Sequence, residues 1–173
     1  MKKLFFLFLS ISALTLVSFV MPDELPIGAA LPKTNVLLKD VSGKEVSLKD
    51  VKKQNGLLVM FSCNTCPYVI KNQPRTKEIA AFAQQNNIGV ILINSNEGQR
   101  SSDDSFEAMK QYAKDQGYNW YYVVDKKSEL ADAFGANKTP ECFLFNKDEK
   151  LVYHGAIDDN PGGEMSEVGR KHL

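Results

Sequence analysis

Short apolar runs alternate with stretches of helical periodicity along most of the chain. The apolar runs at residues 57–61 and 89–93 have turn or polar residues on both sides, which is typical of strands buried in the centre of a sheet. Between them, apolar residues from Tyr68 to Ala83 recur at helical spacing and predict a helix that Pro74 kinks or splits. A strand, a helix and a second strand in this order form the unit of parallel sheets.

The rest of the chain continues this alternation and ends in a hairpin. Asp104 followed by Glu107 is typical of a capping box, and the helix it begins ends at Gly117. Further predicted elements are strands at 35–38, 45–48, 120–124, 142–145 and 151–153, a polar connector at 50–55, a short helix at 129–134 and a tail helix at 164–173. The pattern therefore predicts an α/β fold, with a central mixed β-sheet flanked by helices and an N-terminal β-hairpin extension.

The first 21 residues have a different character. Lys2 and Lys3 precede an apolar and hydroxyl run over residues 4–20, which is the pattern of a secretory signal. The run is also near the shortest length that spans a bilayer, and its small-residue cleavage pattern is weak, so an uncleaved anchor is the second interpretation. We expect residues 1–21 to be a signal peptide or N-terminal membrane anchor and residues 22–173 to form one domain. The protein would then be exported, either periplasmic or anchored facing the periplasm.

The charge balance and the hydrophobic content of the chain limit the classes of function that it can have. Lys plus Arg and Asp plus Glu number 21 each, so no basic field points to nucleic acid as a partner. The chain of 173 residues is 43% hydrophobic, which suits a single ordinary domain with a real core, and we expect a monomer.

Cys63 and Cys66 carry the candidate chemistry. They lie between the strand at 57–61 and the following helix, whose N-terminus offers free N–H groups and a positive dipole end. Both features favour a thiolate, the attacking species in disulfide exchange. We expect Cys63 to be the more exposed nucleophile with a lowered pKa, and Cys66, deeper in the helix, to resolve the mixed disulfide.

A pair of cysteines two residues apart can also be half of a zinc site. Zinc needs four ligands, and the other candidates, Cys142, His154 and His172, do not lie at ligand-like spacing. We therefore expect no metal. Cys142 is interpreted as a buried structural residue, His154 as a solvated strand-end residue, and Asp158 as part of a turn.

The motif and its surroundings resemble a known family. LLVMFSCNTCPYV at 57–69 is similar to the active-site segment of thioredoxin-like redoxins, and residues 122–145 and 151–161 resemble their distal half. Together, over roughly residues 28–163, the chain resembles the peroxiredoxin-like branch of the thioredoxin superfamily. The resemblance implies a thioredoxin-like fold with no cofactor, and a cis Pro140 that follows Thr139 and faces the disulfide. With Tyr68 beside the motif, these residues are expected to line the substrate groove.

Two departures from the family pattern affect the expected chemistry. Thioredoxins carry a buried acid in the strand before the motif, but residues 57–61 contain none. Proton transfer to Cys66 must then use another group, and Glu141 is a candidate whose alternative interpretation is a solvated strand residue. Many members of the branch have His where Thr65 stands, and losing that cation should raise the Cys63 pKa and make the protein more reducing.

The resemblance therefore implies a thiol–disulfide oxidoreductase of the cell envelope, acting as a reductase. Its partners would be protein disulfides or thiols and an upstream thiol electron donor. One alternative is a thiol peroxidase, with Cys66 in the peroxidatic place, but Cys63 stands where such enzymes have Thr, and residues 136–138 include no Arg. The other alternative is a non-enzymatic thiol- or metal-binding module.

Overall fold

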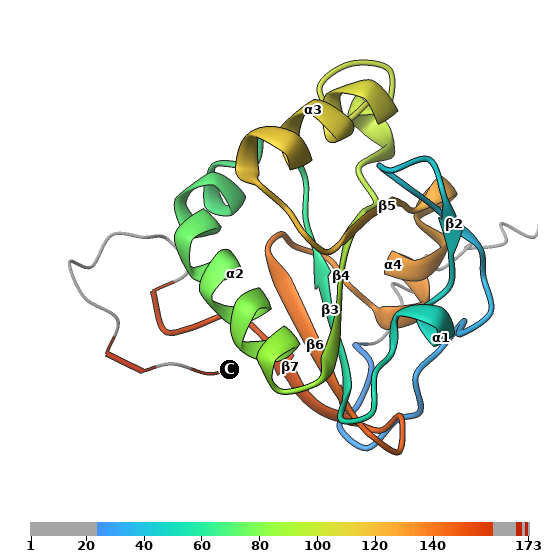
Figure 1. Cartoon of the computed structure of the whole chain (residues 1–173), viewed down its shortest axis with the longest axis vertical. Helices are drawn as coiled ribbons and strands as arrows, with labels where there is room; N and C mark the ends of the chain where they lie inside the picture. The colour runs from blue at the N-terminus through green and yellow to red at the C-terminus, as the bar shows by residue number, and fades with distance from the viewer. Residues whose placement is uncertain (1–23, 161–168, 171, 173) are drawn as a thin grey trace, which may run out of the picture.

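The structure is a computed structural model that describes residues 24–160, 169, 170 and 172 (Figure 1). The predicted signal or anchor at 1–21 lies outside this range, and so does most of the predicted tail helix. Within the described residues, no helix has both the length and the apolar character needed to cross a membrane.

The strands of the described region form one mixed sheet (Figure 1). Its order is β2-β1-β5-β4-β3-β6-β7, with β4 and β3 joined where the Ser62 N–H donates to the Ile93 carbonyl at 2.9 Å. β4 and β5 are parallel, whereas β6 is antiparallel to both β3 and β7. The strands are β1 (Leu38–Asp40), β2 (Glu45–Val46), β3 (Gly56–Phe61), β4 (Ile88–Asn94), β5 (Tyr121–Val124), β6 (Glu141–Asn146) and β7 (Leu151–Gly155). The predicted mixed sheet is confirmed.

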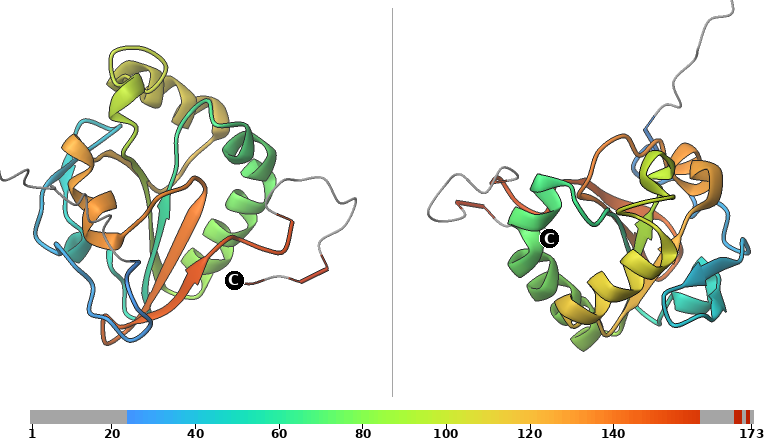
Figure 2. Two further views of the ribbon diagram at one scale, coloured as in Figure 1. Left: turned by 180° about the vertical axis from the view of Figure 1, so that it is seen from behind. Right: turned by 90° about the horizontal axis from the view of Figure 1, so that it is seen from above.

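Helices cover both faces of this sheet (Figure 2). Two of them, α2 (Pro67–Gln85) and α3 (Phe106–Gln116), bury Ala80 and Met109 against one face. On the other face lie α1 (Leu48–Val51) and α4 (Glu129–Phe134), where Phe134 packs edge-to-face on Phe61 and Phe143. Short 3-10 turns, η1 (Glu97–Gln99) and η2 (Lys126–Ser128), complete the connections. Each face therefore has its own apolar cluster.

The predicted N-terminal hairpin is present. β1 and β2 pair antiparallel, with Leu38 opposite Val46, and β1 also pairs with β5, so the hairpin extends the main sheet. The connector predicted at 50–55 is partly wrong, because α1 begins at Leu48 under a capping box between Ser47 and Asp50.

Of the two outcomes predicted for Pro74, the split does not occur: α2 runs through this residue as one helix, and Ala80 beyond it is buried against the sheet. The predicted start of the next helix is wrong. The N-cap of α3 is Ser105, whose hydroxyl accepts the Ala108 N–H, and not Asp104. Asp104 is instead fully buried, which gives it a place in the site described next.

Candidate active site

The two cysteines lie at the junction of β3 and α2. Ser62 makes the last sheet hydrogen bond beside this junction, and Cys63 follows it directly. Cys66 is the N-cap of α2, with Pro67 at the first helical position, where a missing N–H costs nothing. The end of a central strand and the start of a long helix therefore fix the pair.

Thr139 brings the distal half of the chain to both sulfurs. Its Oγ1 lies 3.5 Å from Cys63 Sγ, and its carbonyl accepts the Cys66 thiol at 3.6 Å. The Thr139–Pro140 peptide bond is cis. The structure thus brings together residues 76 and 73 positions apart in the chain, as the resemblance implies.

The exposure of the two cysteines is the reverse of the sequence expectation. Cys63 is only 5% exposed, whereas Cys66 is partly exposed. Burial raises the pKa of Cys63 to about 11, against the opposing effect of the Thr139 hydroxyl. Burial also raises the pKa of Cys66, but hydrogen bonds from Thr139 and from the backbone of Val69 and Tyr68 outweigh it, so that pKa lies below its ordinary value.

The position of the helix explains this reversal. The free N–H groups of the first turn of α2 point to the N-cap residue, Cys66, and Cys63 lies three residues before that cap. The expectation that Cys63 is the exposed, acidic thiol of the pair is therefore wrong for this dithiol structure.

A buried polar network lies behind the turn that carries Cys63. The Asp104 carboxylate accepts the Asn64 N–H at 2.8 Å and the side-chain amide of Asn94 at 2.6 Å through Oδ1. Its Oδ2 accepts the side-chain amide of Asn96 at 2.7 Å, and the Tyr122 hydroxyl donates to Asn64 Oδ1 at 2.8 Å. The sequence pattern missed this network, although the polar residues that follow the strand at 89–93 were a signal for it.

An open groove of about 490 Å³ lies beside the pair. Both cysteines and Thr139 line it, together with side chains from α4 and from the loop before β6, among them Ala131, Asp132, Asn137 and Lys138. Pro140 and Tyr68 do not contribute to this lining, and Tyr68 is 53% exposed next to Cys66. A direct substrate contact of either residue stays a prediction.

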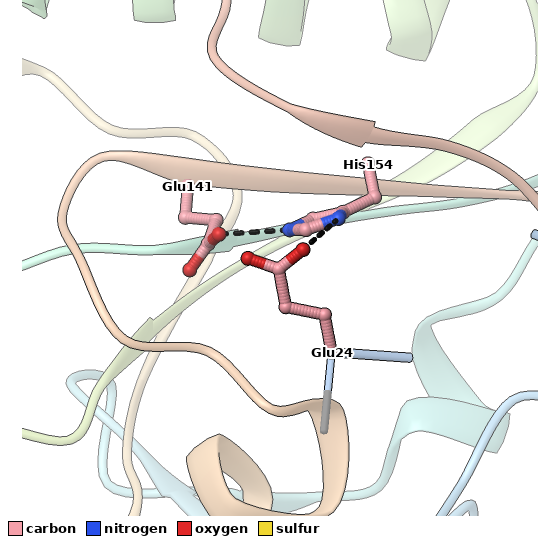
Figure 3. Close-up of side chains that lie close together, drawn as sticks. All are labelled: Glu24, Glu141 and His154. Atoms are coloured by element: carbon pink, nitrogen blue, oxygen red, sulfur yellow. Dashed lines mark hydrogen bonds and ion pairs between the residues drawn. The ribbon is translucent and has the colours of Figure 1, made fainter. Parts of the chain in front are cut away.

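Glu141 and His154 are not solvated, contrary to the interpretation preferred from sequence. Glu141 has no exposed surface, and its Oε1 lies 2.8 Å from His154 Nε2 (Figure 3). Its Oε2 accepts the Asn137 N–H at 3.0 Å, and Lys138 Nζ lies 3.4 Å from Oε1. Glu141 therefore supports the loop that lines the groove, and no contact places it on a sulfur.

Glu24 completes this cluster from the N-terminal side. Its Oε2 lies 3.8 Å from His154 Nδ1, whereas Glu141 faces the other ring nitrogen (Figure 3). The His154 ring stacks on Phe143 with centroids 4.4 Å apart. The two carboxylates face opposite nitrogens of one ring, and one ligand atom from each of the three residues lies within 4.8 Å of the others.

The remaining candidate residues have structural surroundings. Cys142 is fully buried in β6, and burial raises its thiol pKa far above the ordinary value, which confirms its structural interpretation. Asp158 accepts the Asn160 N–H, as expected of a turn, and it also pairs with Arg75 Nε at 3.2 Å.

Comparison with known proteins identifies the family of this chain. The family model described as Redoxin matches residues 26–171. The thiol-disulfide oxidoreductase ResA of Bacillus anthracis is 26% identical over 134 residues, which cover 78% of this chain and 72% of the relative. The ResA of Bacillus subtilis (strain 168) is 29% identical over 122 residues, 68% of this chain and 62% of the relative.

Solved structures show the same fold. An uncharacterized conserved protein from Geobacillus kaustophilus has a TM-score of 0.74 at 35% identity, covering 79% of this chain and 72% of its own. A hypothetical protein from Sinorhizobium meliloti 1021 has a TM-score of 0.76 at 30% identity, covering 84% and 79%. The thioredoxin domain of a Bacteroides vulgatus thiol-disulfide oxidoreductase shares the fold at 18% identity, with a TM-score of 0.65 and coverage of 80% and 94%.

Proposed function

Because this chain belongs to the Redoxin family and is a thiol–disulfide oxidoreductase, we propose that its Cys63–Cys66 pair reduces disulfides in proteins outside the cytosol. The observation that carries the proposal is the contact of Thr139 with both sulfurs at the side of an open groove. A substrate disulfide entering that groove meets the dithiol directly.

We infer the roles of the two thiols from their exposure and acidity. Cys66 is the partly exposed thiol with the lowered pKa, so its thiolate attacks a substrate sulfur and the other substrate sulfur leaves as a thiolate that takes up a proton. Cys63 then attacks Cys66 in the mixed disulfide and releases the second substrate thiol. Two electrons and two protons pass to the substrate, and the pair ends as a disulfide.

The reducing direction follows from the environment of Cys63. Its raised pKa disfavours the thiolate, and Thr65 supplies no cation to stabilise one. A dithiol whose Cys63 thiolate is weakly stabilised gives up its electrons more readily, and this effect opposes that of the stabilised Cys66 thiolate. An upstream thiol donor would return the disulfide to the dithiol after each cycle.

The location of the protein in the cell is also part of the proposal. The two lysines and apolar run of residues 2–20 support a signal peptide or membrane anchor, and hence a domain that acts in the cell envelope. Disulfides persist in that compartment, so a reductase there has substrates.

A trapping experiment with the full chain tests the exchange. Reduced Cys63→Ser and Cys66→Ser variants are each mixed with a peptide that carries one disulfide, and adducts are measured by mass spectrometry. Cys63→Ser should accumulate a mixed disulfide through Cys66, and the double variant should form none.

Two results would contradict the proposal. If neither single variant forms an adduct and the wild-type chain releases no peptide thiol, the domain is a binding module without exchange. If the wild-type chain instead consumes hydrogen peroxide rapidly with a thiol donor, the peroxidase interpretation takes its place.

A further inference from the structure

Asp104 is a fully buried carboxylate beside the redox pair, and neither the family resemblance nor the exchange mechanism uses it. It lies between η1 and α3 and accepts hydrogen bonds from the backbone N–H of Asn64 and from the side-chain amides of Asn94 and Asn96, at 2.6–2.8 Å. All three partners are donors, which is the pattern that an ionised carboxylate requires. A negative charge is therefore held next to the residue that follows Cys63.

The network leaves Asn64 little freedom. Its N–H is held by Asp104, its Oδ1 accepts the Tyr122 hydroxyl at 2.8 Å, and its Nδ2 donates to the Asp103 carbonyl at 2.6 Å. Asn64 is itself only 6% exposed. Because Cys63 is joined to Asn64 by one peptide bond, fixing Asn64 also fixes the position of Cys63.

Several other polar and ionisable groups surround Cys63, among them Asp132 and Lys138, which line the same groove. Cys66 faces it from the start of α2 and Thr139 from the loop before β6, and burial keeps Tyr122 neutral by raising its pKa well above the ordinary value. The nearest cation in the network is Arg100, which donates to the carbonyls of Asp104 at 2.9 Å and Asn94 at 2.7 Å. Arg100 therefore binds backbone carbonyl groups of the network, whereas the Asp104 carboxylate is bound by backbone and side-chain amides.

We propose that Asp104 is a positioning residue of the redox pair, which fixes Cys63 through Asn64 and whose charge lowers the reduction potential of the Cys63–Cys66 couple. The inference rests on the proposed function. In this role Asp104 replaces the buried acid that the strand before the motif lacks. An anion beside Cys63 disfavours its thiolate, and the Coulomb effect of Asp104 does raise the Cys63 pKa.

The sign of the effect follows from the couple itself. Reduction of the disulfide takes two electrons and two protons and gives the dithiol, and any stabilisation of a thiolate favours that reduced form. Removing the Asp104 charge stabilises the Cys63 thiolate, so at pH values where Cys63 ionises the reduced form gains and the protein becomes more oxidising.

Asp104→Asn in the full chain tests this. Asn is nearly isosteric and its carbonyl still accepts the Asn64 N–H, so the change removes charge more than shape. The measurement is the equilibrium constant of the Cys63–Cys66 couple against glutathione. We expect the pH at which Cys63 becomes alkylated to fall, and the constant measured at about pH 11, where Cys63 carries a thiolate, to shift about threefold toward the reduced protein.

Asp125→Asn is the matched control. Asp125 is also buried, directly after β5, but its carboxylate holds the Ser95 hydroxyl and the N–H groups of Leu130 and Ala131 at the start of α4. The loss of stability from replacing a buried carboxylate should be similar in both variants. The equilibrium constant of the Cys63–Cys66 couple, in contrast, should change by less than about twofold in Asp125→Asn.

The outcomes separate this inference from the proposed function. An unchanged constant and an unchanged Cys63 alkylation profile in folded Asp104→Asn overturn the role of Asp104 alone. A wild-type protein without a reversible couple overturns the proposed function instead. If Asp104→Asn does not fold, Arg100→Gln tests the same field with the opposite sign: the pH at which Cys63 becomes alkylated should rise, and no rise overturns the inference.

Discussion

The carbonyl of Thr139 accepts the Cys66 thiol at 3.6 Å, so the loop before β6 meets the N-terminus of α2 at a single sulfur. The hydroxyl of the same residue lies 3.5 Å from the other sulfur, Cys63. Thr139, from the distal half of the chain, therefore contacts both cysteines. Its carbonyl is available to orient Cys66, and its hydroxyl is available to orient Cys63.

Thr139→Val should slow the reaction of Cys66 without changing the fold. The substitution keeps the shape of the side chain and removes the hydroxyl hydrogen bond that lowers the pKa of both thiols. A lost hydrogen bond to a charged group of about 1 kcal/mol corresponds to roughly a fivefold slower alkylation of Cys66 near neutral pH. Thr34→Val, remote from the groove, is the control, and equal rates in both variants would contradict this role of the hydroxyl.

Alkylation of the reduced protein should follow the order Cys66, Cys63, Cys142. Cys66 is partly exposed with a lowered pKa, so it reacts at the lowest pH of the three, whereas Cys63 gains a thiolate only as the pH rises toward about 11. Cys142 is fully buried and should react only after unfolding. Mass spectrometry after limited iodoacetamide treatment gives the order, and first labelling of Cys63 would show that the motif turn rearranges in solution to expose it.

Glu141→Ala should destabilise the protein by about 3 kcal/mol, because it leaves the mostly buried His154 and the Asn137 N–H without their partner. Glu24→Ala removes the 53% exposed partner on the other side of the same ring and should cost less than about 1 kcal/mol. Urea unfolding of both variants measures the difference. Equal losses of stability in the two variants would mean that the burial of Glu141 does not decide its contribution to the free energy of unfolding.

Gly89→Ala should destabilise the sheet by about 3 kcal/mol through overpacking. A Cβ at this position of β4 would lie 2.1 Å from the Val51 carbonyl oxygen, so strand and α1 must separate. Gly98→Ala is the control, because its Cβ would have no neighbour closer than 3.8 Å. Thermal unfolding compares the two, and a harmless Gly89→Ala would show that α1 can shift freely.

Hydrophobic periodicity was sufficient to predict the central elements. The strands at 57–61 and 89–93 and the helix at 129–134 are confirmed within a residue or two, since their burial follows directly from composition. The meeting of Cys63, Cys66 and Thr139 came from the family resemblance, because no local pattern predicts a contact across more than 70 residues.

The polar residues of the site could not be predicted in the same way. Asp104 has the local pattern of a helix cap, and only the folded chain shows that the adjacent Ser105 takes that role and frees the carboxylate for Asn64. The relative acidity of the cysteines depends on the residue at which α2 begins, a boundary that pattern alone does not fix.

The burial of Cys142 also governs what oxidation can do to this protein. A chain with an odd number of accessible thiols always has one left over, and such a thiol links molecules to one another. Here the third sulfur is sealed inside the sheet, which leaves only Cys63 and Cys66 beside the groove. Each turnover can therefore close only the small ring at the start of α2, and the protein can pass through repeated oxidation as separate molecules.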